Sequence, residues 1–278
     1  MNKKIIKRIS KLIAAASAAA ILLSLAGCSI GGNTNKEKTA ATQAATVRVM
    51  FPEGSTVCQI AELLEKNGVC SAADFMALSN DAALASEYGI VIENPQNRAF
   101  LLEGYLYPDT YDFYVGESAE KAIRRFLKNA QSKFDDEFRA ECEKAGMTVD
   151  EVITLASIIQ EEAGDPAEMS KVSSVLHNRL NSKKFKSLQC DVTIFYLEGS
   201  VRPNVSEEKF DELRELYNTY KCKGLPEGPI TNVGSEALNA ALNPVESDWY
   251  YFVTDDAGEY HYAETWEEHQ ENCENAGL

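Results

Sequence analysis

The stretch TVDEVITLASIIQEE, residues 148–162, predicts a helix from which the rest of the fold can be worked out. Thr148 and Glu151 form a capping box, in which each side chain accepts a hydrogen bond from a backbone N–H group at the start of the helix. The apolar residues that follow recur at helical spacing. They place one face of the helix in a protein core: Val152, Leu155, Ala156, Ile159 and Ala163.

Two neighbouring carboxylates end this helix in different surroundings. At about 100° per residue, Glu162 lies next to the apolar face, whereas Glu161 lies on the far side and is expected to face solvent. A carboxyl group at an apolar boundary has a raised pKa, because its charged form is disfavoured there. A general acid that works near neutral pH needs such a pKa. Glu162 is therefore the candidate catalytic residue. A helix-end carboxylate paired with a nearby Lys or Arg is the alternative.

The helix ends sharply, because Gly164 breaks the pattern directly after these carboxylates. Asp165 and Pro166 then begin a second helix, with Asp165 as the N-cap and Pro166 at the first helical position. The buried side of this second helix is predicted from Val172, Val175, Leu176, Arg179 and Leu180. A break at this point leaves the Glu162 side chain at the edge of a cleft.

The chain begins with the features of a lipoprotein signal peptide, predicted over residues 1–27. Basic residues come first, and an apolar run of about 14 residues follows. This run is shorter than the roughly 20 residues that a membrane-spanning helix needs. The sequence Leu25-Ala26-Gly27-Cys28 resembles the lipobox of bacterial lipoproteins, which implies cleavage before Cys28 and lipid attachment to that cysteine. An uncleaved membrane anchor is the alternative.

Residues 28–45 are rich in small and polar side chains and lack apolar periodicity, so they predict a flexible linker. We therefore expect the folded part at the bacterial cell membrane, on its extracytoplasmic face, held by the lipid anchor on Cys28. In either version of the N-terminal segment, the body of the protein lies outside the cytoplasm and is tethered to a membrane.

The charge of the chain argues against a nucleic-acid partner. The formal net charge is −16, and cleavage before Cys28 removes five basic residues and no acidic ones, which leaves 22 basic residues against 43 acidic residues. Such a surface repels phosphate backbones. Six widely spaced cysteines follow Cys28 without a CxxC pair, so no zinc site is expected, and their pairing into disulfides stays open.

A small module is predicted over residues 46–95. Residues 47–51 alternate as in a strand. Ser55 or Thr56 then caps a helix that ends at Gly68, and a second short helix begins after the cap Ser71. This strand and helix pair resembles the small LysM-like element that binds glycan strands. A structural cap on the main domain is the alternative.

The larger module, residues 96–278, is predicted to mix helices with a β-hairpin, which gives the chain an α+β fold. Aromatic residues gather in the stretch 102–111, where they either belong to the core or form a platform that stacks on sugars. A long helix begins near Ser118. The turn sequence Asp255-Asp256-Ala257-Gly258 predicts a hairpin, and Thr265 caps a final helix.

Eight short segments carry a family resemblance. They are EGY (103–105), YPDTY (107–111), ASIIQEE (156–162), VSSVLHNRL (172–180), LQCD (188–191), YNTY (217–220), GLPEGP (224–229) and YFV (251–253). No single segment is specific, but the ordered set, from residue 47 to the C-terminus, resembles the endolytic transglycosylase family called MltG or YceG-like. The resemblance implies a catalytic domain with a lysozyme-like cleft.

The resemblance places the family's catalytic glutamate on Glu162, in agreement with the helix pattern. It implies cleavage of the β-1,4 bond between N-acetylmuramic acid and N-acetylglucosamine within glycan strands of peptidoglycan. Glu162 would act first as general acid and then as general base, and a 1,6-anhydro ring would close on the muramic acid. No water is consumed, so the reaction is that of a lyase. No metal or cofactor is implied.

Polar groups on short loops suit the hydroxyl and N-acetyl groups of a sugar polymer. We predict five substrate-binding residues: Glu103, Gln189, Asp191, Asn218 and Tyr220. The chain departs from the family at Gln160, where many relatives carry a glutamate, so a supporting carboxylate is missing there. It also has a lipobox and a short module where relatives commonly have a transmembrane anchor and a longer region.

Two other functions stay open. A hydrolytic muramidase would use Glu162 together with Asp191 as its second carboxylate. A non-catalytic lipoprotein would bind peptidoglycan without cutting it. For the transglycosylase, the expected partners are peptidoglycan glycan strands, the membrane through the lipid anchor, and the cell-wall synthesis machinery.

Overall fold

The computed structural model of the protein describes residues 45–278. The predicted signal peptide, the predicted lipid-attachment residue Cys28 and all of the predicted linker except Ala45 lie outside these residues. Along the chain the elements are β1 (Thr46–Met50), α2 (Val57–Lys66), α3 (Ala72–Leu78), α4 (Ala82–Glu87), η1 (Pro95–Asn97), β2 (Thr110–Tyr114), α5 (Ala119–Lys133), α6 (Asp136–Ala145), α7 (Val149–Glu162), α8 (Pro166–Asn181), α9 (Val192–Tyr196), η2 (Leu197–Val201), η3 (Arg202–Asn204), α10 (Glu207–Tyr217), α11 (Ser235–Leu242), β3 (Tyr251–Thr254), β4 (Tyr260–Ala263) and α12 (Trp266–Asn275).

The described residues form a mostly helical α+β fold with two separate two-stranded antiparallel sheets, β1–β2 and β3–β4. The α+β prediction is thereby confirmed. The LysM-like character of residues 46–95 and the lysozyme-like cleft stay predictions.

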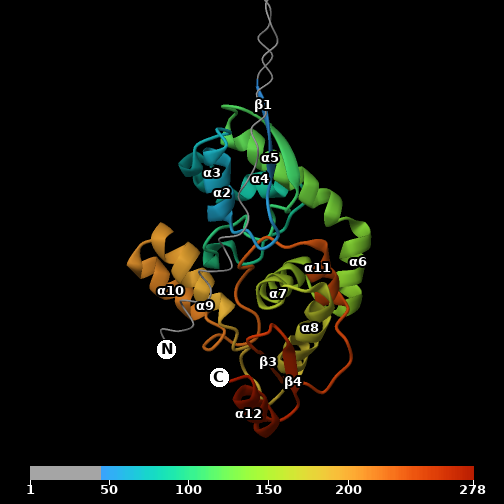
Figure 1. The fold of residues 1–278 in the computed structure, drawn as a ribbon. Helices are drawn as coiled ribbons and strands as arrows, with labels where there is room; N and C mark the ends of the chain where they lie inside the picture. Colours follow the sequence, from blue (N-terminus) through green and yellow to red (C-terminus); the bar gives the residue numbers. More distant parts are fainter. Residues whose placement is uncertain (1–44) are drawn as a thin grey trace, which may run out of the picture. The chain divides into compact units, whose positions relative to one another are not determined.

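Helix α7 lies in the middle of the described elements (Figure 1). Helices α8 and α11 pack beside it, and α9 contacts it from the other side in this view. All five residues of its predicted buried face are fully buried. Ile153, Ser157 and Ile158 are buried as well, because helices surround α7 on more than the one face that an amphipathic pattern describes.

The helix caps predicted from the sequence are confirmed where the structure describes them. The predicted caps Thr56, Ser71, Thr148, Asp165 and Thr265 each accept a hydrogen bond from the first turn through the side chain. Ser118 caps the long helix α5 in the same way. Three of these caps are full capping boxes, including the one that begins α7. These bonds are local, so a short window of sequence contains both partners.

The sheet β1–β2 joins distant parts of the chain. Val49 lies opposite Tyr111 in its register, so the partner of β1 comes from beyond residue 95, where the predicted small module ends. On the inner face, the Tyr111 ring lies 4.5 Å from the ring of Phe126 in α5, measured between centroids. The division of the chain at residues 95 and 96 stays a prediction.

The aromatic stretch 102–111 belongs to the core. Tyr105, Tyr107 and Tyr111 are all buried, and Tyr105 is 1% exposed. The Tyr111 hydroxyl donates a hydrogen bond to the carbonyl of Tyr107 at 2.6 Å. The interpretation of these rings as a sugar-stacking platform is therefore wrong, because their faces are covered by other side chains.

The hairpin near the C-terminus is confirmed. Strands β3 and β4 pair with Tyr251 opposite Ala263, and the turn closes with a hydrogen bond from the Gly258 N–H to the Asp255 carbonyl. Gly258 has a φ of 86°, which glycine adopts without strain. Helix α12 packs against both strands.

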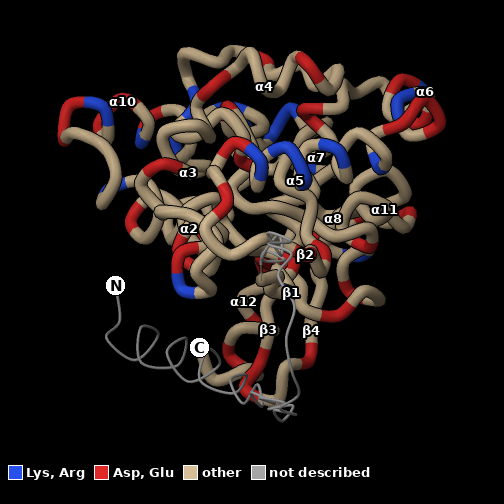
Figure 2. The backbone as a smooth tube through the Cα atoms, turned by 90° about the horizontal axis from the view of Figure 1, so that it is seen from above, with Lys and Arg blue, Asp and Glu red and all other residues tan. Residues whose placement is uncertain are grey.

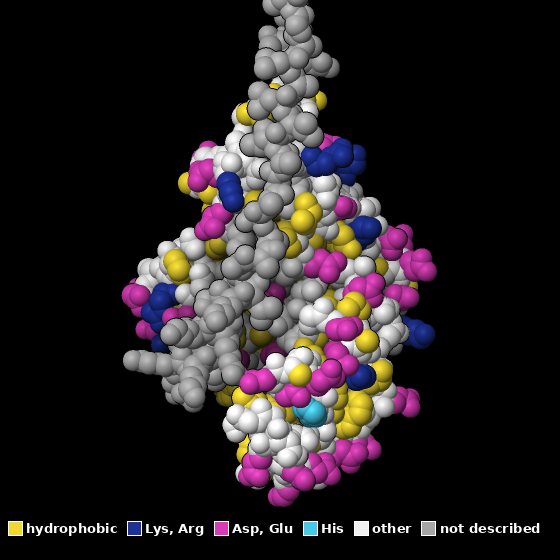
Figure 3. Space-filling model, in the orientation of Figure 1, with side chains coloured by type: hydrophobic (Ala, Val, Ile, Leu, Met, Phe, Trp, Pro, Cys, Tyr) yellow, Lys and Arg dark blue, Asp and Glu magenta, His cyan; other side chains and the backbone are white. Residues whose placement is uncertain are grey.

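Acidic residues are spread over the described chain, as Figure 2 shows for α6 and α10 among others. They also gather at the foot of the face in Figure 3, where α12 lies in Figure 1. The six cysteines within residues 45–278 are free thiols. Among the same residues, no helix combines the length and the apolar character that crossing a membrane requires.

Candidate active site

Glu162 is the last residue of α7 and lies where the chain turns away from the helix. The next residue, Ala163, is fully buried and extended, with φ −132° and ψ 116°. The hydroxyl of Tyr260 in β4 donates a hydrogen bond to the Glu162 carbonyl at 2.9 Å. The end of α7 is thereby fixed to the hairpin β3–β4, and the half-buried Glu162 side chain begins from a fixed backbone.

Two loops come together beside this helix end. The Gln189 N–H donates to the Thr219 carbonyl at 2.9 Å, and the Cys190 N–H donates to the Thr219 hydroxyl at 2.9 Å. Gln189 has a φ of 58°, which is uncommon for a residue with a side chain. The fully buried Thr219 and the buried Cys190 therefore hold the two loops together.

The residues on either side of these buried anchors remain accessible. Gln189, Asp191 and Tyr220 are exposed, and Asn218 is half-buried. The Tyr220 hydroxyl donates to Asp191 Oδ1 at 2.8 Å, and the Tyr220 N–H donates to Asn218 Oδ1 at 2.9 Å. The structure thus brings four of the five residues predicted to bind substrate into one group.

The carboxyl group of Glu162 belongs to the same group. Its pKa is raised to about 7, mainly by burial and next by the negative charge of Asp191. The positive charge of Arg179 and a hydrogen bond from the Cys190 thiol act in the opposite direction. Glu162 can therefore hold a proton near neutral pH and release it with little cost, which is what an acid that later becomes a base needs.

Arg179 and Cys190 were not predicted as parts of the site. The Arg179 guanidinium donates from Nε to the Tyr250 carbonyl at 2.7 Å and from Nη1 to the Leu188 carbonyl. It lies 5.6 Å from the ring centroid of Phe185. A cation on the predicted buried side of α8 is the sequence signal that points to Arg179, because a buried charge needs partners.

Glu161 differs from its neighbour in geometry rather than in pKa. It is exposed, as predicted, yet partial desolvation raises its pKa to about 7 as well. Its carboxylate lies against the turn at Gly54, where it lines a hollow of about 520 Å³ together with Gln160. A raised pKa therefore does not separate the two glutamates. What separates them is that the charges of Asp191 and Arg179 and a hydrogen bond with the Cys190 thiol act on Glu162.

Gln160 has a structural partner. Its side-chain oxygen accepts a hydrogen bond from the Gly234 N–H at 3.1 Å, at the start of α11. The amide therefore ties the end of α7 to the neighbouring helix. An amide can accept this bond at any pH, whereas a carboxylate in its place would also bring a negative charge beside Glu161 and Glu162.

Glu103, the fifth predicted substrate-binding residue, lies inside the fold and is 2% exposed. Its carboxylate accepts hydrogen bonds from the Val57 N–H at 3.0 Å and from Asn232 Nδ2 at 2.9 Å. Val57 is the first residue of α2, so Glu103 accepts a hydrogen bond from an N–H group at the start of that helix, while burial raises the Glu103 pKa well above its ordinary value. Its oxygens are used within the protein and do not join the group around Glu162.

No cluster of three or more His, Cys, Asp or Glu side chains suited to a metal ion occurs within residues 45–278. The group around Glu162 instead offers one titratable carboxyl, a second carboxylate, and amide and hydroxyl groups. Such a set suits proton transfer on a polyhydroxylated substrate.

Comparison with known proteins shows which family the chain resembles. Residues 16–275 match the YceG-like family. Two curated relatives have the name endolytic murein transglycosylase. The one from Bacillus subtilis is 34% identical over 230 residues, which cover 80% of this chain and 63% of the relative. The one from Streptococcus pneumoniae is 29% identical over 240 residues, which cover 80% of this chain and 43% of the relative. The chain thus spans less than two thirds of the length of these relatives.

The fold is also similar to a solved structure. A YceG-like protein from Listeria monocytogenes, known from its crystal structure, superimposes with a TM-score of 0.70 at 33% sequence identity. The superposition covers 82% of this chain and 75% of the other.

Proposed function

Because the chain belongs to the YceG-like family, we propose that it is a lytic transglycosylase that cuts peptidoglycan within its glycan strands. The observation that carries this proposal is the carboxyl group of Glu162. It lies at the end of a buried helix, has a pKa near 7 and is grouped with accessible polar residues of two loops. Relatives that are 34% and 29% identical to this chain over the aligned residues have the name of that activity.

The proposed reaction needs one group that gives a proton and then takes one. Protonated Glu162 gives its proton to O4 of the departing N-acetylglucosamine as the bond from that oxygen to C1 of muramic acid breaks. The C6 hydroxyl of the muramic acid then attacks C1 and loses its proton to the Glu162 carboxylate. A 1,6-anhydro ring forms, no water is used, and Glu162 regains the proton with which it began.

The surrounding residues are assigned to support this cycle. Asp191 is negatively charged beside Glu162, where it would stabilise the positive charge that develops at C1 as the bond breaks. Tyr220 holds the Asp191 carboxylate in place. Gln189 and Asn218 would bind the hydroxyl and N-acetyl groups of the neighbouring sugars.

The proposed function predicts how the rate of cleavage depends on pH. Bond breaking requires protonated Glu162, so kcat/KM for release of anhydro-muropeptides is expected to fall as pH rises through about 7. With the ordinary pKa of 4.5, the fall would already come in acid. Replacing Asp191 by Asn removes a negative charge that raises this pKa, so the alkaline limb of the profile moves to lower pH.

The control for this profile is Glu161→Gln. It removes a carboxyl group whose pKa is also about 7 but whose charge affects the Glu162 pKa less than the charge of Asp191 does. The alkaline limb of this variant is expected to move less than that of Asp191→Asn. If the alkaline limb moved in Glu161→Gln and stayed in place in Asp191→Asn, the titrating group would be Glu161. That result would contradict the role of Glu162.

We also propose that Cys28 anchors the mature protein to the membrane. The proposal rests on the sequence Leu25-Ala26-Gly27-Cys28 after a short apolar run. Intact-protein mass spectrometry of the membrane fraction should find a chain that begins at a lipid-modified Cys28, and Cys28→Ala should keep residues 1–27. A wild-type protein that retains these residues would contradict the lipoprotein assignment and favour an uncleaved anchor.

A further inference from the structure

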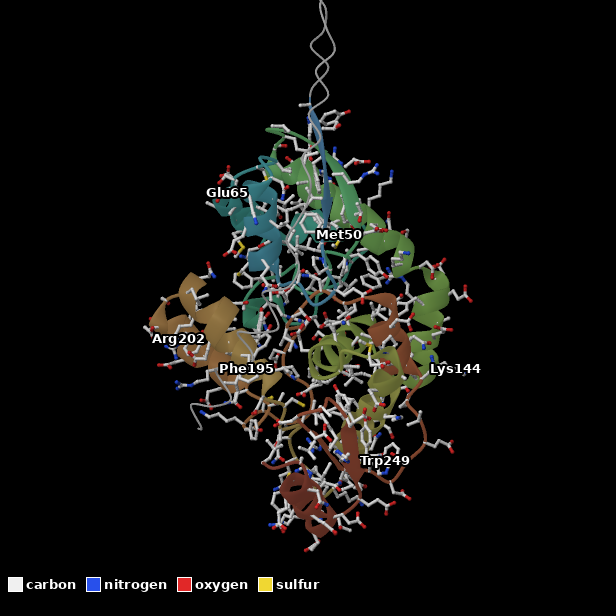
Figure 4. All side chains as sticks on the ribbon, in the orientation of Figure 1. Met50, Glu65, Lys144, Phe195, Arg202 and Trp249 are labelled. Carbon is white, nitrogen blue, oxygen red and sulfur yellow. The ribbon has the colours of Figure 1, made fainter. Side chains whose placement is uncertain are left out.

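Two aromatic rings project into solvent beside the candidate active site. Phe195 is 50% exposed and Tyr220 is 49% exposed. The next residue along the chain, Tyr196, is in contrast 5% exposed. Among residues 45–278, Phe195 makes no ring–ring contact, and Figure 4 shows it on α9, beside the central helix α7 of Figure 1. The fold therefore uses Tyr196 for packing and leaves the Phe195 ring uncovered.

Helix geometry places Phe195 on the same face as Asp191. Asp191 is the N-cap of α9 and has helical backbone angles, and the Phe195 N–H donates to the Asp191 carbonyl at 3.1 Å. Side chains four residues apart lie one above the other along a helix. Tyr220 reaches the same carboxylate from the other loop, through its hydroxyl. Asp191 is thus accompanied by an exposed ring on each of two elements.

This group adjoins the reacting carboxyl. Helices α7 and α9 are in contact, and the charge of Asp191 acts on Glu162. A glycan strand bound across Glu162 would therefore extend over the Asp191 side of the site. The C–H faces of a pyranose ring are apolar and pack on flat aromatic rings, while its hydroxyl groups bond to neighbouring polar groups.

We propose that Phe195, together with Tyr220, forms a subsite on which a sugar ring next to the cleaved bond stacks. The inference rests on the proposed function, which supplies the sugar substrate. It goes beyond that function because Phe195 lies in none of the sequence segments predicted to form the site. Phe195 is half exposed next to the charged and polar groups of the site and makes no ring–ring contact within residues 45–278, so one face of its ring is open to a ligand. Stacking on a sugar gives it a use at this position.

The test compares three full-length variants with the wild type. Phe195→Ala removes the ring, Phe195→Trp keeps a flat aromatic surface, and Tyr114→Ala removes a ring of nearly equal exposure, 49%, from strand β2. Each protein is measured for anhydro-muropeptide release at a series of concentrations of purified sacculi. Each is also measured for cosedimentation with sacculi, which needs no catalysis.

Phe195→Ala is expected to raise KM and weaken cosedimentation by about two- to tenfold. It should leave the alkaline limb of the pH profile in place, because Phe195 carries no charge. Phe195→Trp should restore binding, and Tyr114→Ala should bind and cut like the wild type.

Unchanged cosedimentation and KM in Phe195→Ala would overturn the subsite. A ring that contacts a protein partner instead of a sugar would give this result. An equal loss in Tyr114→Ala would also overturn it, since the loss would then follow any exposed ring. A wild type that binds sacculi without producing anhydro ends would contradict the proposed function instead, and cosedimentation of the variants would still decide the subsite.

Discussion

Replacing Glu162 by Gln is expected to lower the rate of anhydro-muropeptide release by about 10²- to 10⁴-fold, the contribution typical of a general acid–base group. The amide has nearly the same shape as the carboxyl group but neither gives nor takes a proton near pH 7. Release from purified sacculi should be followed by chromatography over a long incubation. Thermal unfolding of the variant should stay close to that of the wild type, because the change keeps the size of the side chain.

The matched control is Glu161→Gln, one residue earlier on the same helix. Its carboxyl group also has a pKa of about 7, but it lies against Gly54 rather than beside Asp191. We expect this variant to keep the rate within a few-fold of the wild type. Undiminished release from Glu162→Gln, or an equal loss from Glu161→Gln, would be incompatible with the assignment of Glu162.

Replacing Asp150 by Ala is expected to destabilise the fold by about 3–5 kcal/mol. Asp150 lies in the first turn of α7, where its Oδ1 accepts a hydrogen bond from the Tyr105 hydroxyl at 2.5 Å and its Oδ2 pairs with Arg98. The side chain of Arg98 is 2% exposed. Removing the carboxylate leaves a buried guanidinium without its counter-charge. Denaturant unfolding measures the loss.

The control for this prediction is the ion pair of Arg48 and Asp112 on the sheet β1–β2. Its side chains are 72% and 59% exposed. Asp112→Ala should therefore change the free energy of unfolding by no more than about 1 kcal/mol. If both variants lost the same small amount of unfolding free energy, burial would not make the Asp150–Arg98 pair more stabilising than an exposed pair. In that case α7 would not depend on Asp150 for its position.

The sequence predicts the helix starts well, because each depends on residues within one turn. The capping boxes of Thr148 and Thr265 occur as expected, and the predicted cap Thr56 forms a capping box as well. Helix α10 carries the same kind of signal, with Ser206 as the cap and with Phe210, Leu213 and Tyr217 on the buried face. Helices of this type can be found from the sequence if every serine followed by an amphipathic stretch is considered.

The pairing of β1 with β2 could not be predicted in this way. The two strands are separated by three helices and a long aromatic stretch, and strand pairing depends on the side chains that the two share in the core. The aromatic stretch itself was ambiguous between core and surface. Its rings are buried because β2 and α5 fold over them, which is a tertiary contact and has no local signature.

The candidate site was predicted in part. The helix pattern correctly distinguishes a half-buried Glu162 from an exposed Glu161, but it does not show that both have raised pKa values. The Glu161 carboxylate lies against the turn at Gly54, which is far away in sequence. Likewise, the hydrogen bonds of Glu103 to Val57 and Asn232 come from distant segments. From sequence spacing alone, Glu103 and Gln189 were therefore both predicted to bind substrate.

The central claim is that one carboxyl group breaks the glycosidic bond without water, and the product tests it directly. Sacculi digested with the full-length wild-type protein should be analysed by mass spectrometry for the new glycan ends. We expect 1,6-anhydro-muramic acid at those ends, inside strands that were intact before digestion. Reducing ends that are heavier by one water would contradict it, and would instead make the protein a hydrolase in which Asp191 works with Glu162.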